Sequence, residues 1–435
     1  MVLQNSSSQA IQLAGAMKLR RPLVLAQISG FVLLALALFS FSLHRDLGGY
    51  HRRPGGPQHQ DPDWIPPGAV LSQRNITTYL TAILDSEDRS LPRLECPQPN
   101  LTRYTPLKPT HPNPSSTPYF FALDLRNNLP ILPRLLGSII STINFLGPSN
   151  CALSIVEGNS ADGTPEVLSA LQSSLGSSFP THFILRNEID PLAEDRFGKL
   201  AILRNLALEP MLRDPNRYAE STTVFINDVA ICMEDILELI YQKRYQNADM
   251  ACAFDWIGGG EEGEAVFYDS YIARGINGDL FFEIPLPSVS WSRATDLFWN
   301  DEKTKGRFEG HVPFQVFSCW NGAVAFTAKP VVSGEVKFRS VRRDRGECHQ
   351  GEPQLFCKDM WWAGYGKIMV VPSVNLEYSD EKGRYIKEMK GYTGRWAGEE
   401  KEEEERIEWV GPPEKVKCMP TFDDQTWRDW NETLG

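Results

Sequence analysis

Positive charge is scarce in this sequence of 435 residues, because 44 lysine and arginine residues face 55 aspartate and glutamate residues. The formal net charge of −11 argues against a nucleic-acid partner, which would require a basic face. Part of the acidity is local, since residues 399–408 read EEKEEEERIE, a run typical of a solvated face or a disordered insert. We therefore expect no nucleic-acid binding.

Cysteine and histidine residues at the spacing of a zinc site are absent, and no Cys-x-x-Cys motif occurs. A structural zinc site is therefore not expected. The eight cysteines form an even set that an oxidising lumen could pair, although spacing alone does not give the pairing.

One long apolar run stands at residues 23–43, LVLAQISGFVLLALALFSFSL, and it contains no charged residue. It is long enough to cross a hydrocarbon core of about 30 Å. A cleaved signal peptide would have a shorter core and a small-residue cleavage site, whereas this run ends in HRDLGGY. We predict a signal anchor after a cytoplasmic tail at residues 1–22. Basic residues nearly balance across the run, but sequons at Asn75, Asn100 and Asn431 favour a lumenal domain.

The rest of the chain divides by composition into three parts. Residues 44–118 are rich in proline and predict an extended lumenal stem, although residues 69–88 could form a short helix that packs on the main domain. We expect residues 119–380 to form the main folded domain, and residues 381–435 to form a C-terminal extension that includes the acidic run.

Strand and helix patterns alternate through residues 119–380, which predicts an α/β domain with a mainly parallel sheet covered by helices on both faces. Polar side chains follow the carboxyl ends of four predicted strands: Glu157, Asn187, Asp228 and Asp255. Ligands of such sheets bind at this edge, so we expect these side chains to converge on one site.

Asn227 and Asp228 interrupt an apolar run in TTVFINDVAIC, residues 222–232. The alternatives to a ligand-binding role are a turn, which asparagine and aspartate favour, and a cap of the following helix. The convergence of the four strand ends favours the site.

An ordered series of motifs carries a resemblance over about 60% of the chain: FFALDLRNNLPILP, VEGNSADGT, GKLAILRN, FINDVAIC, CWNGAVAF and GECHQGEPQLFCKDMWWAGYGKI. From about residue 119 to residue 379 the chain resembles the fungal capsular α-1,3-mannosyltransferase family. The resemblance implies a nucleotide-sugar-binding domain of the GT-A type in a single-span, type II Golgi membrane protein. It also implies retaining transfer of mannose from GDP-mannose to a mannose-containing glycan through an α-1,3 linkage. A transferase of xylose or glucose, and a non-catalytic membrane-anchored partner of a glycosyltransferase complex, remain alternatives.

The resemblance also implies a divalent cation, Mn²⁺ or Mg²⁺, near the diphosphate of the donor. FIND stands where enzymes of this fold carry an Asp-x-Asp motif, but Val229 follows Asp228, so one carboxylate is present. Carboxylate oxygens suit these hard cations, which bind through few protein ligands and substrate phosphates. We expect Asp228 to bind the metal and His349 to complete its coordination, although a lone histidine is more often structural.

Donor contacts are expected from Glu157, Arg196, Arg204, Asn227 and Asp228. Arginine suits bidentate phosphate binding, and Arg196 and Arg204 share one helical face. The competing interpretations are an ordinary loop around Glu157 and a solvated basic face for the arginines.

Acceptor contacts are expected from Trp320, Asn321 and Asp255, because an aromatic ring stacks on sugars and an amide bonds their hydroxyls. Core packing of Trp320 is the alternative. A carboxylate facing an oxocarbenium-like centre is expected among Glu347, Glu352 and Asp359. A disulfide between Cys348 and Cys357 would pin this loop.

Overall fold

The computed structural model describes residues 70–110, 113, 115–185, 187, 189–190, 195–258, 264–286, 291–397 and 406–435. The predicted tail, the predicted anchor at residues 23–43 and the first part of the predicted stem lie outside the described residues. Most of the acidic run at residues 399–408 lies outside them as well.

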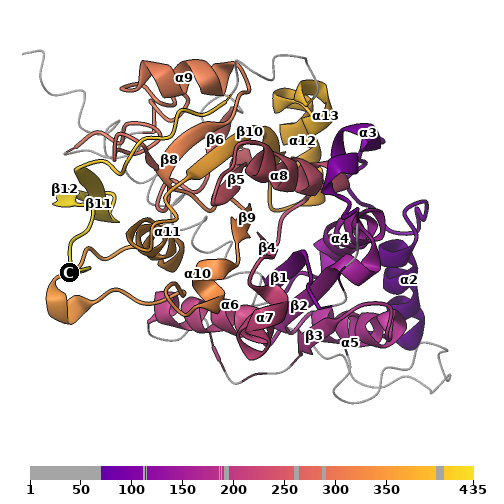
Figure 1. Ribbon diagram of the computed structural model, residues 1–435. Coiled ribbons are helices and arrows are strands. Elements are labelled where there is room, and N and C mark those ends of the chain that lie inside the picture. The colour runs from indigo at the N-terminus through magenta and orange to yellow at the C-terminus, as the bar shows by residue number, and fades with distance from the viewer. Residues whose placement is uncertain are drawn as a thin grey trace, which may run out of the picture. The chain divides into compact units, whose positions relative to one another are not determined.

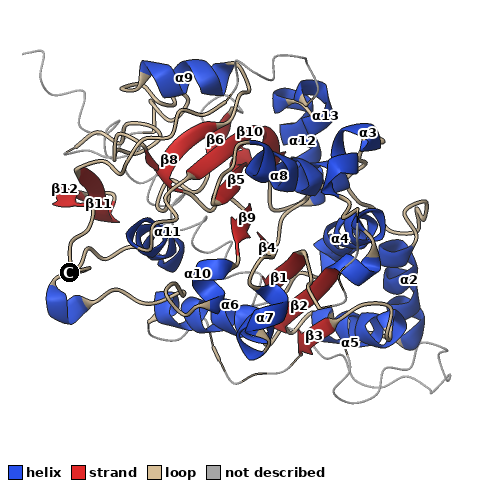
Figure 2. Cartoon of the chain, viewed as in Figure 1, coloured by secondary structure: helices blue, strands red, loops and turns tan. Residues whose placement is uncertain are grey.

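The domain is built on one large mixed sheet (Figures 1 and 2). Along the sheet the strands follow the order β3 (Thr181–Ile184), β2 (Cys151–Glu157), β1 (Tyr119–Leu125), β4 (Thr222–Ile226), β9 (Ala323–Thr327), β5 (Met250–Gly258), β10 (Ile368–Leu376), β8 (Phe314–Ser318) and β7 (Arg274–Gly275). A further strand, β6 (Ala265–Phe267), pairs with β5.

Strand direction is mainly, but not wholly, parallel. β3, β2, β1 and β4 pair in parallel, as do β5 and β10. The antiparallel strand β9 lies between β4 and β5, so those two strands still run the same way. The predicted mainly parallel sheet is confirmed, while the antiparallel strands β8 and β9 were not foreseen, because a buried strand of either direction reads as a continuous apolar run.

Helices cover both faces of the sheet because neighbouring strand residues point to opposite sides. Phe120 packs in one apolar cluster with α6 (Arg196–Arg213) and α11 (Glu352–Trp362). Phe121 packs in a second cluster with α4 (Leu132–Leu146), α5 (Thr164–Leu175) and α8 (Met233–Tyr245). Both faces are buried, which explains the near absence of polar residues within the central strands.

Smaller elements surround this frame. They are α2 (Gln73–Leu84), α3 (Leu101–Tyr104), α7 (Pro215–Tyr218), α9 (Glu302–Glu309), α10 (Lys329–Val332), α12 (Asp380–Lys390), α13 (Thr393–Trp396) and the antiparallel pair β11 (Lys415–Thr421) and β12 (Asp424–Asp429). Short 3₁₀ turns stand at Thr105–Leu107, Leu129–Ile131, Pro148–Asn150 and Arg343–Arg345.

Residues from 70 onward, assigned by composition to the stem, are packed on the domain rather than extended. The predicted short helix is α2, which packs on α4 and α5. Arg93 donates to the carbonyl of Ala82 at the end of α2 (2.6 Å), and Arg103 makes a two-bond ion pair with Glu238 of α8 (2.9 and 3.0 Å). Prolines therefore do not mark the edge of the folded unit here.

Among the described residues, one helical stretch, Leu129–Leu146, is long and apolar enough to cross a membrane. Most of it is buried, and α4, which forms its larger part, lies in the core. The apolar residues of Leu129–Leu146 are therefore explained by packing in the core of the domain.

Three disulfides join segments that are distant in sequence: Cys96–Cys232, Cys252–Cys319 and Cys348–Cys418. Cys151 and Cys357 are free and buried. The expected bridge between Cys348 and Cys357 is wrong. Cys357 faces the core from α11, with its Sγ 3.4 Å from the carbonyl oxygen of Cys319, whereas Cys348 in the preceding loop meets β11.

The packing of residues 70–107 gives a testable boundary. We expect a chain that begins at residue 70 to fold, and a chain that begins at residue 111 to be strongly destabilised. The shorter chain loses the Cys96–Cys232 bridge, and a bridge closing a loop of about 100 residues contributes roughly 4–5 kcal/mol. It also leaves Glu238 buried without Arg103. Melting temperature and resistance to trypsin measure the difference, and equal values for the two chains would contradict the boundary.

Candidate active site

The site begins where β4 ends, at Asn227 and Asp228. The Asn227 backbone N–H donates to the carbonyl of Gly322 (2.9 Å), and its side-chain oxygen accepts from Nε1 of Trp320 (3.0 Å). The Asp228 carboxylate accepts from Nδ2 of Asn128 (2.9 Å). Both side chains are half-buried. Asp228 does not cap the next helix, because Cys232 is the N-cap of α8 and Asp235 completes its capping box.

The loops that follow β1 and β2 are hydrogen-bonded to each other at the same edge of the sheet. The backbone N–H of Asn128 donates to Oγ1 of Thr164 (3.1 Å), and that of Leu129 donates to Asp162 (3.0 Å). Glu157, at the end of β2, is buried and accepts from the backbone N–H groups of Asn159 (3.1 Å) and Ser160 (2.6 Å).

Glu157 therefore stabilises the loop that follows β2, which is the role expected under the alternative interpretation of an ordinary loop around Glu157. Asn187 joins the same loop, since its amide donates to the carbonyl oxygen of Glu157 (2.6 Å). Asn128, which sequence reasoning did not select, is the residue that ties these loops to Asp228.

Arg204 of α6 is a buried cation at the centre of the site. Its guanidinium lies 4.7 Å from the centre of the Trp320 ring, and its Nε is 3.3 Å from a carboxylate oxygen of Glu352. Nη1 is buried and makes no hydrogen bond within the described part of the chain, whereas Nε meets Glu352 as an ion pair outside hydrogen-bond geometry. A buried donor without an acceptor is costly, so Nη1 has unused capacity to bind an anionic group.

Carboxyl groups of one buried residue, Glu352, and two half-buried residues, Asp124 and Asp269, lie near this arginine. Burial raises the pKa of Asp124 to about 6, although the charge of Arg204 partly offsets the effect, and Asp228 and Glu352 reinforce it. Burial likewise raises the pKa of Asp269 to about 6 and that of Glu352 above its ordinary value. Each shift means that a positive charge near these groups would be stabilising.

Asp124 and Asp269 were not selected from the sequence. The signal for Asp124 was available, because a charged residue inside the otherwise apolar strand YFFALDL is costly without a function. No comparable signal marked Asp269, which follows β6 in an ordinary turn.

Trp320 and Asn321 are almost fully buried, at 1% and 0% exposure, so the open sugar contact predicted for them is corrected. The Asn321 backbone N–H donates to Asp269 (2.9 Å), and its amide donates to the carbonyl of Ala253 (2.9 Å). Asn321 and Gly322 have positive φ values of 52° and 81°, which makes a tight turn between β8 and β9. These residues position the edge of the site rather than present a surface.

Asp255 is also fully buried, and it accepts from the hydroxyl of Tyr378 (2.6 Å). Burial, followed by the charge of Asp269, raises its pKa well above the ordinary value. Its second oxygen has no hydrogen-bond partner among the described residues. The structure therefore brings Asp255 to the site, but beneath its surface.

Glu347 and Asp359 belong to a separate ion-pair network. Arg339 makes two bonds to each of them, with distances of 2.6–3.0 Å, and Lys358 adds a bond of 2.8 Å to Glu347. Burial disfavours the charged form of Glu347, but these bonds outweigh it and lower its pKa to about 2. The network also includes Thr433, whose hydroxyl donates to Glu347 (3.1 Å).

Among the three predicted catalytic carboxylates, Glu352 is thus the one placed beside Arg204. Arg196 begins α6, is exposed, and contributes to the electrostatics of Glu352. His349 is half-buried with its ring 5.3 Å from that of Phe197. Within the described ranges no group of three or more His, Cys, Asp or Glu side chains forms a ready metal cage, so a cation here would need further ligands from substrate.

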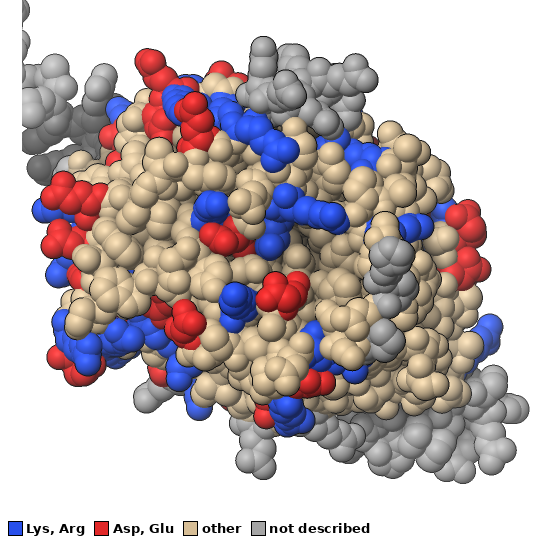
Figure 3. Space-filling view, in the orientation of Figure 1, with Lys and Arg blue, Asp and Glu red and all other residues tan. Residues whose placement is uncertain are grey.

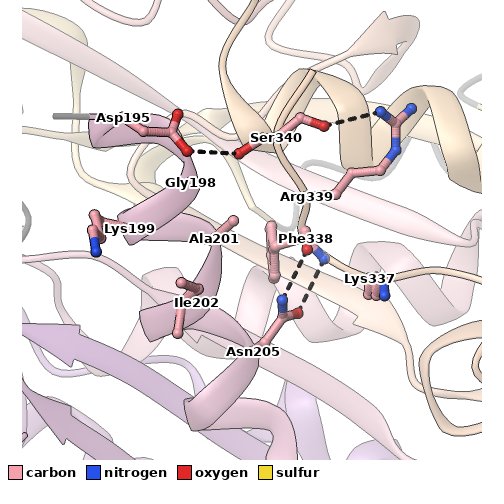
Figure 4. A pocket seen from close by; sticks show the side chains of 10 residues that line it. All are labelled: Asp195, Gly198, Lys199, Ala201, Ile202, Asn205, Lys337, Phe338, Arg339 and Ser340. Carbon is pink, nitrogen blue, oxygen red and sulfur yellow. Dashed lines mark hydrogen bonds between the residues drawn. The ribbon is translucent and has the colours of Figure 1, made fainter. Parts of the chain in front are cut away.

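A pocket of about 350 Å³ lies beside α6 (Figure 4). Lys199 and Lys337 flank it, and Asn205 exchanges two hydrogen bonds with the backbone of Phe338 (2.8 and 3.1 Å). Phe338, which lines this pocket, also lies with its ring centre 5.5 Å from the guanidinium of Arg204. Acidic and basic side chains are interspersed on the face drawn in Figure 3, without a continuous patch of one sign.

The candidate site thus combines carboxyl groups with a buried arginine at the carboxyl ends of sheet strands, the edge at which α/β domains bind their ligands. A family model described as cryptococcal mannosyltransferase 1 matches residues 118–359. The α-1,3-mannosyltransferase CMT1 of Cryptococcus neoformans var. neoformans serotype D is 30% identical over 424 residues, 90% of this chain and 87% of that protein. This chain therefore belongs to the cryptococcal mannosyltransferase family, and the enzyme class predicted from its motifs, a glycosyltransferase, is confirmed.

Similar solved structures are more distant. TarS 1–349 of S. aureus has 14% identity and a TM-score of 0.34, with 62% of each chain covered. The mannosyltransferase PcManGT from Pyrobaculum calidifontis, in complex with GDP-Man and Mn²⁺, has 12% identity and a TM-score of 0.34, with 64% of each chain covered. Likeness at this level is too low to bear on the activity of this chain.

The two environments of Glu347 and Glu352 predict opposite phenotypes. We expect Glu347→Gln to lower the free energy of unfolding by about 3–5 kcal/mol at pH 7, because it leaves buried Lys358 and Arg339 short of a partner. We expect Glu352→Gln to destabilise the fold less than Glu347→Gln does, because burial already disfavours the charged form of Glu352, but to lower mannosyl transfer by at least roughly a hundredfold. Urea unfolding and transfer rates measure both.

The pH dependence of Glu347→Gln follows from the lowered pKa. The carboxylate stabilises the fold fully above its ordinary pKa, and this contribution is lost as pH falls towards 2. The difference in stability between parent and variant should therefore shrink below about pH 4.5. A stability difference between parent and variant that grows on acidification would contradict the structural role of Glu347. So would a Glu347→Gln protein that loses activity while its free energy of unfolding is unchanged.

Proposed function

We propose that this protein transfers mannose from GDP-mannose to a mannose-containing glycan, forms an α-1,3 linkage, and retains the configuration of the donor. The family and its 30%-identical relative, an α-1,3-mannosyltransferase, support the sugar and the linkage. The observation that carries the proposal is the buried guanidinium of Arg204 beside the strand ends, whose Nη1 has no hydrogen-bond partner among the described residues and whose Nε lies 3.3 Å from Glu352.

Arg204 and Arg196 bind the diphosphate of the donor. They stand eight residues apart on α6 and therefore near one face of the helix. The phosphate oxygens supply an acceptor for Nη1 of Arg204, which has none among the described residues, and give the guanidinium a second anionic partner beside Glu352. Charge that builds on the leaving diphosphate strengthens these contacts in the transition state.

Asn227 and Asp228 complete the donor site from β4. Trp320 fixes the amide of Asn227, and Asn128 fixes the carboxylate of Asp228, so neither group needs to reorganise when the donor binds. Glu157 acts indirectly by holding the loop that follows β2.

The residues present fit a divalent cation, Mn²⁺ or Mg²⁺. Asp228 offers a half-buried carboxylate, and Asp124 and Asp269, whose pKa values are raised mainly by burial, are carboxyl groups whose charged form a nearby cation would stabilise. Such ions bind through one or two carboxylates and substrate phosphates, and His349 is the further ligand that we propose. When bound, the ion supplies Lewis-acid stabilisation of the leaving diphosphate.

Glu352 is the proposed electrostatic partner of the oxocarbenium-like centre. It lies at the first position of α11, almost fully buried, and Arg204 is the charged group that offsets its raised pKa most. Glu347 and Asp359 have their oxygens occupied by Arg339, so we assign them no contact with substrate.

The proposed site is tested by the donor preference and by Asp228→Asn. We expect the parent chain from residue 70 onward to transfer mannose from GDP-mannose to mannose oligosaccharides, with a rate that depends on Mn²⁺. Asp228→Asn keeps the shape of the side chain but removes its charge, and turnover should fall at least roughly a hundredfold with little change in melting temperature. Asp296→Asn, which alters an exposed ion pair with Lys305, is the matched control. Full activity of Asp228→Asn at every Mn²⁺ concentration would exclude a metal-binding role for Asp228. Transfer by the parent from a different nucleotide sugar, but not from GDP-mannose, would exclude GDP-mannose as the donor.

We further propose that the protein is a single-pass type II protein of the Golgi membrane, held by residues 23–43, with the catalytic domain in the lumen. The three disulfides favour an oxidising compartment. The sequon residues Asn75, Asn100 and Asn431 are all exposed, as acceptors of glycans must be.

The anchor gives a direct expectation for fractionation. The full chain should stay in the membrane pellet after carbonate extraction, because an apolar helix in the bilayer is not released by high pH. A chain without residues 1–45, expressed behind a cleavable signal, should be secreted and soluble. Recovery of the shortened chain in the carbonate-washed pellet would exclude a single anchor at residues 23–43.

A further inference from the structure

Tyr268 places an exposed aromatic ring at the edge of the site, whereas Trp320, the aromatic residue selected from the sequence, is buried. Tyr268 directly follows β6, and its side chain is 49% exposed. Its backbone N–H donates to the carbonyl of Asp255 (3.1 Å). Partial burial, and then the charges of Asp255, Asp269 and Asp228, raise the pKa of its hydroxyl to about 12, as expected for a ring close to all three carboxyl groups.

The ring of Tyr268 is held in place from below. Its centroid lies 4.9 Å from that of Tyr378, with the two planes at 61°, and the Tyr378 hydroxyl is bonded to the buried carboxyl of Asp255 (2.6 Å). Edge-to-face pairs of this geometry are stabilising and leave the outer face of the exposed ring free to contact another molecule. The ring is therefore a fixed platform beside the carboxylates.

We propose that Tyr268 determines acceptor binding by stacking its exposed ring on a pyranose ring of the acceptor glycan. This inference rests on the proposed function of the site. One face of a pyranose presents C–H groups, which pack on the electron-rich face of an aromatic ring while the hydroxyls at the sugar edge remain free for hydrogen bonds. Trp320, to which the sequence assigned this contact, has no exposed face to offer.

The acceptor suits this position better than the donor nucleotide does. Arg204 reaches the site from α6, which packs on β1 and β2, whereas Tyr268 reaches it from the hairpin of β5 and β6. The antiparallel strand β9 separates these two halves of the sheet. If the diphosphate of the donor binds to Arg204, the half of the sheet that carries Tyr268 remains available to the acceptor.

The decisive experiment separates acceptor binding from donor binding. Tyr268→Ala should raise the KM for a mannose oligosaccharide roughly tenfold, which corresponds to about 1.4 kcal/mol. GDP affinity, and the hydrolysis of GDP-mannose without acceptor, should not change. Tyr268→Phe keeps the ring and should behave as the parent does, while Tyr268→Leu keeps apolar bulk beside Tyr378 and should behave as the alanine variant does. Trp427→Ala, which removes a ring of 46% exposure from β12, is the matched control and should leave the acceptor KM unchanged.

Two results would overturn the assignment. An unchanged acceptor KM in both Tyr268→Ala and Tyr268→Leu would exclude stacking on the acceptor. A parallel loss of GDP affinity would assign the ring to the donor base. If the parent transfers no mannose, the proposed function fails, and calorimetric titration of mannose oligosaccharides into the parent and Tyr268→Leu still decides whether the ring binds sugar.

Discussion

The buried positive charge of Arg204 is the interaction on which the candidate site depends. It offsets the cost of burying Asp124, Asp269 and Glu352, whose pKa values all lie above their ordinary range even in its presence. The ionisation of the surrounding carboxyl groups, and with it the capacity of the site to hold a cation, is therefore coupled to one guanidinium whose Nη1 also has no hydrogen-bond partner among the described residues.

The sheet brings these groups together through two different devices. Parallel strands place the residues after β1, β2 and β4 at one edge, which is a general property of such sheets. The second device is the buried turn at Asn321 and Gly322, which lies between β8 and β9 and delivers Trp320 to Asn227 and a backbone N–H to Asp269. A Cβ atom at position 322 would lie 3.0 Å from the side chain of Val229, and the backbone there has a positive φ that favours glycine. The turn therefore has no room for a residue larger than glycine at this position.

Local patterns predicted the parts of the site that local chemistry determines. The position of Asp228 at a strand end and the pairing of Arg196 with Arg204 on one helix follow from periods of two and 3.6 residues. The different roles of Glu347 and Glu352 could not be predicted in this way. Only four residues separate the two, and their environments differ because Glu347 pairs with Arg339 and Glu352 with Arg204. Trp320 was misjudged for the same reason, since the rings of Phe338 and Phe356 that cover it come from later segments.

The Cys96–Cys232 bridge has a consequence for the order in which the protein matures. Cys96 leaves the ribosome long before Cys232, and the next cysteine to follow it is Cys151, which remains unpaired and buried in the finished structure. In an oxidising compartment these two thiols could pair before Cys232 is made. Burial of Cys151, in the apolar cluster that α4, α5 and α8 share with β2, protects its thiol from that reaction, and an isomerase would reverse a premature pair.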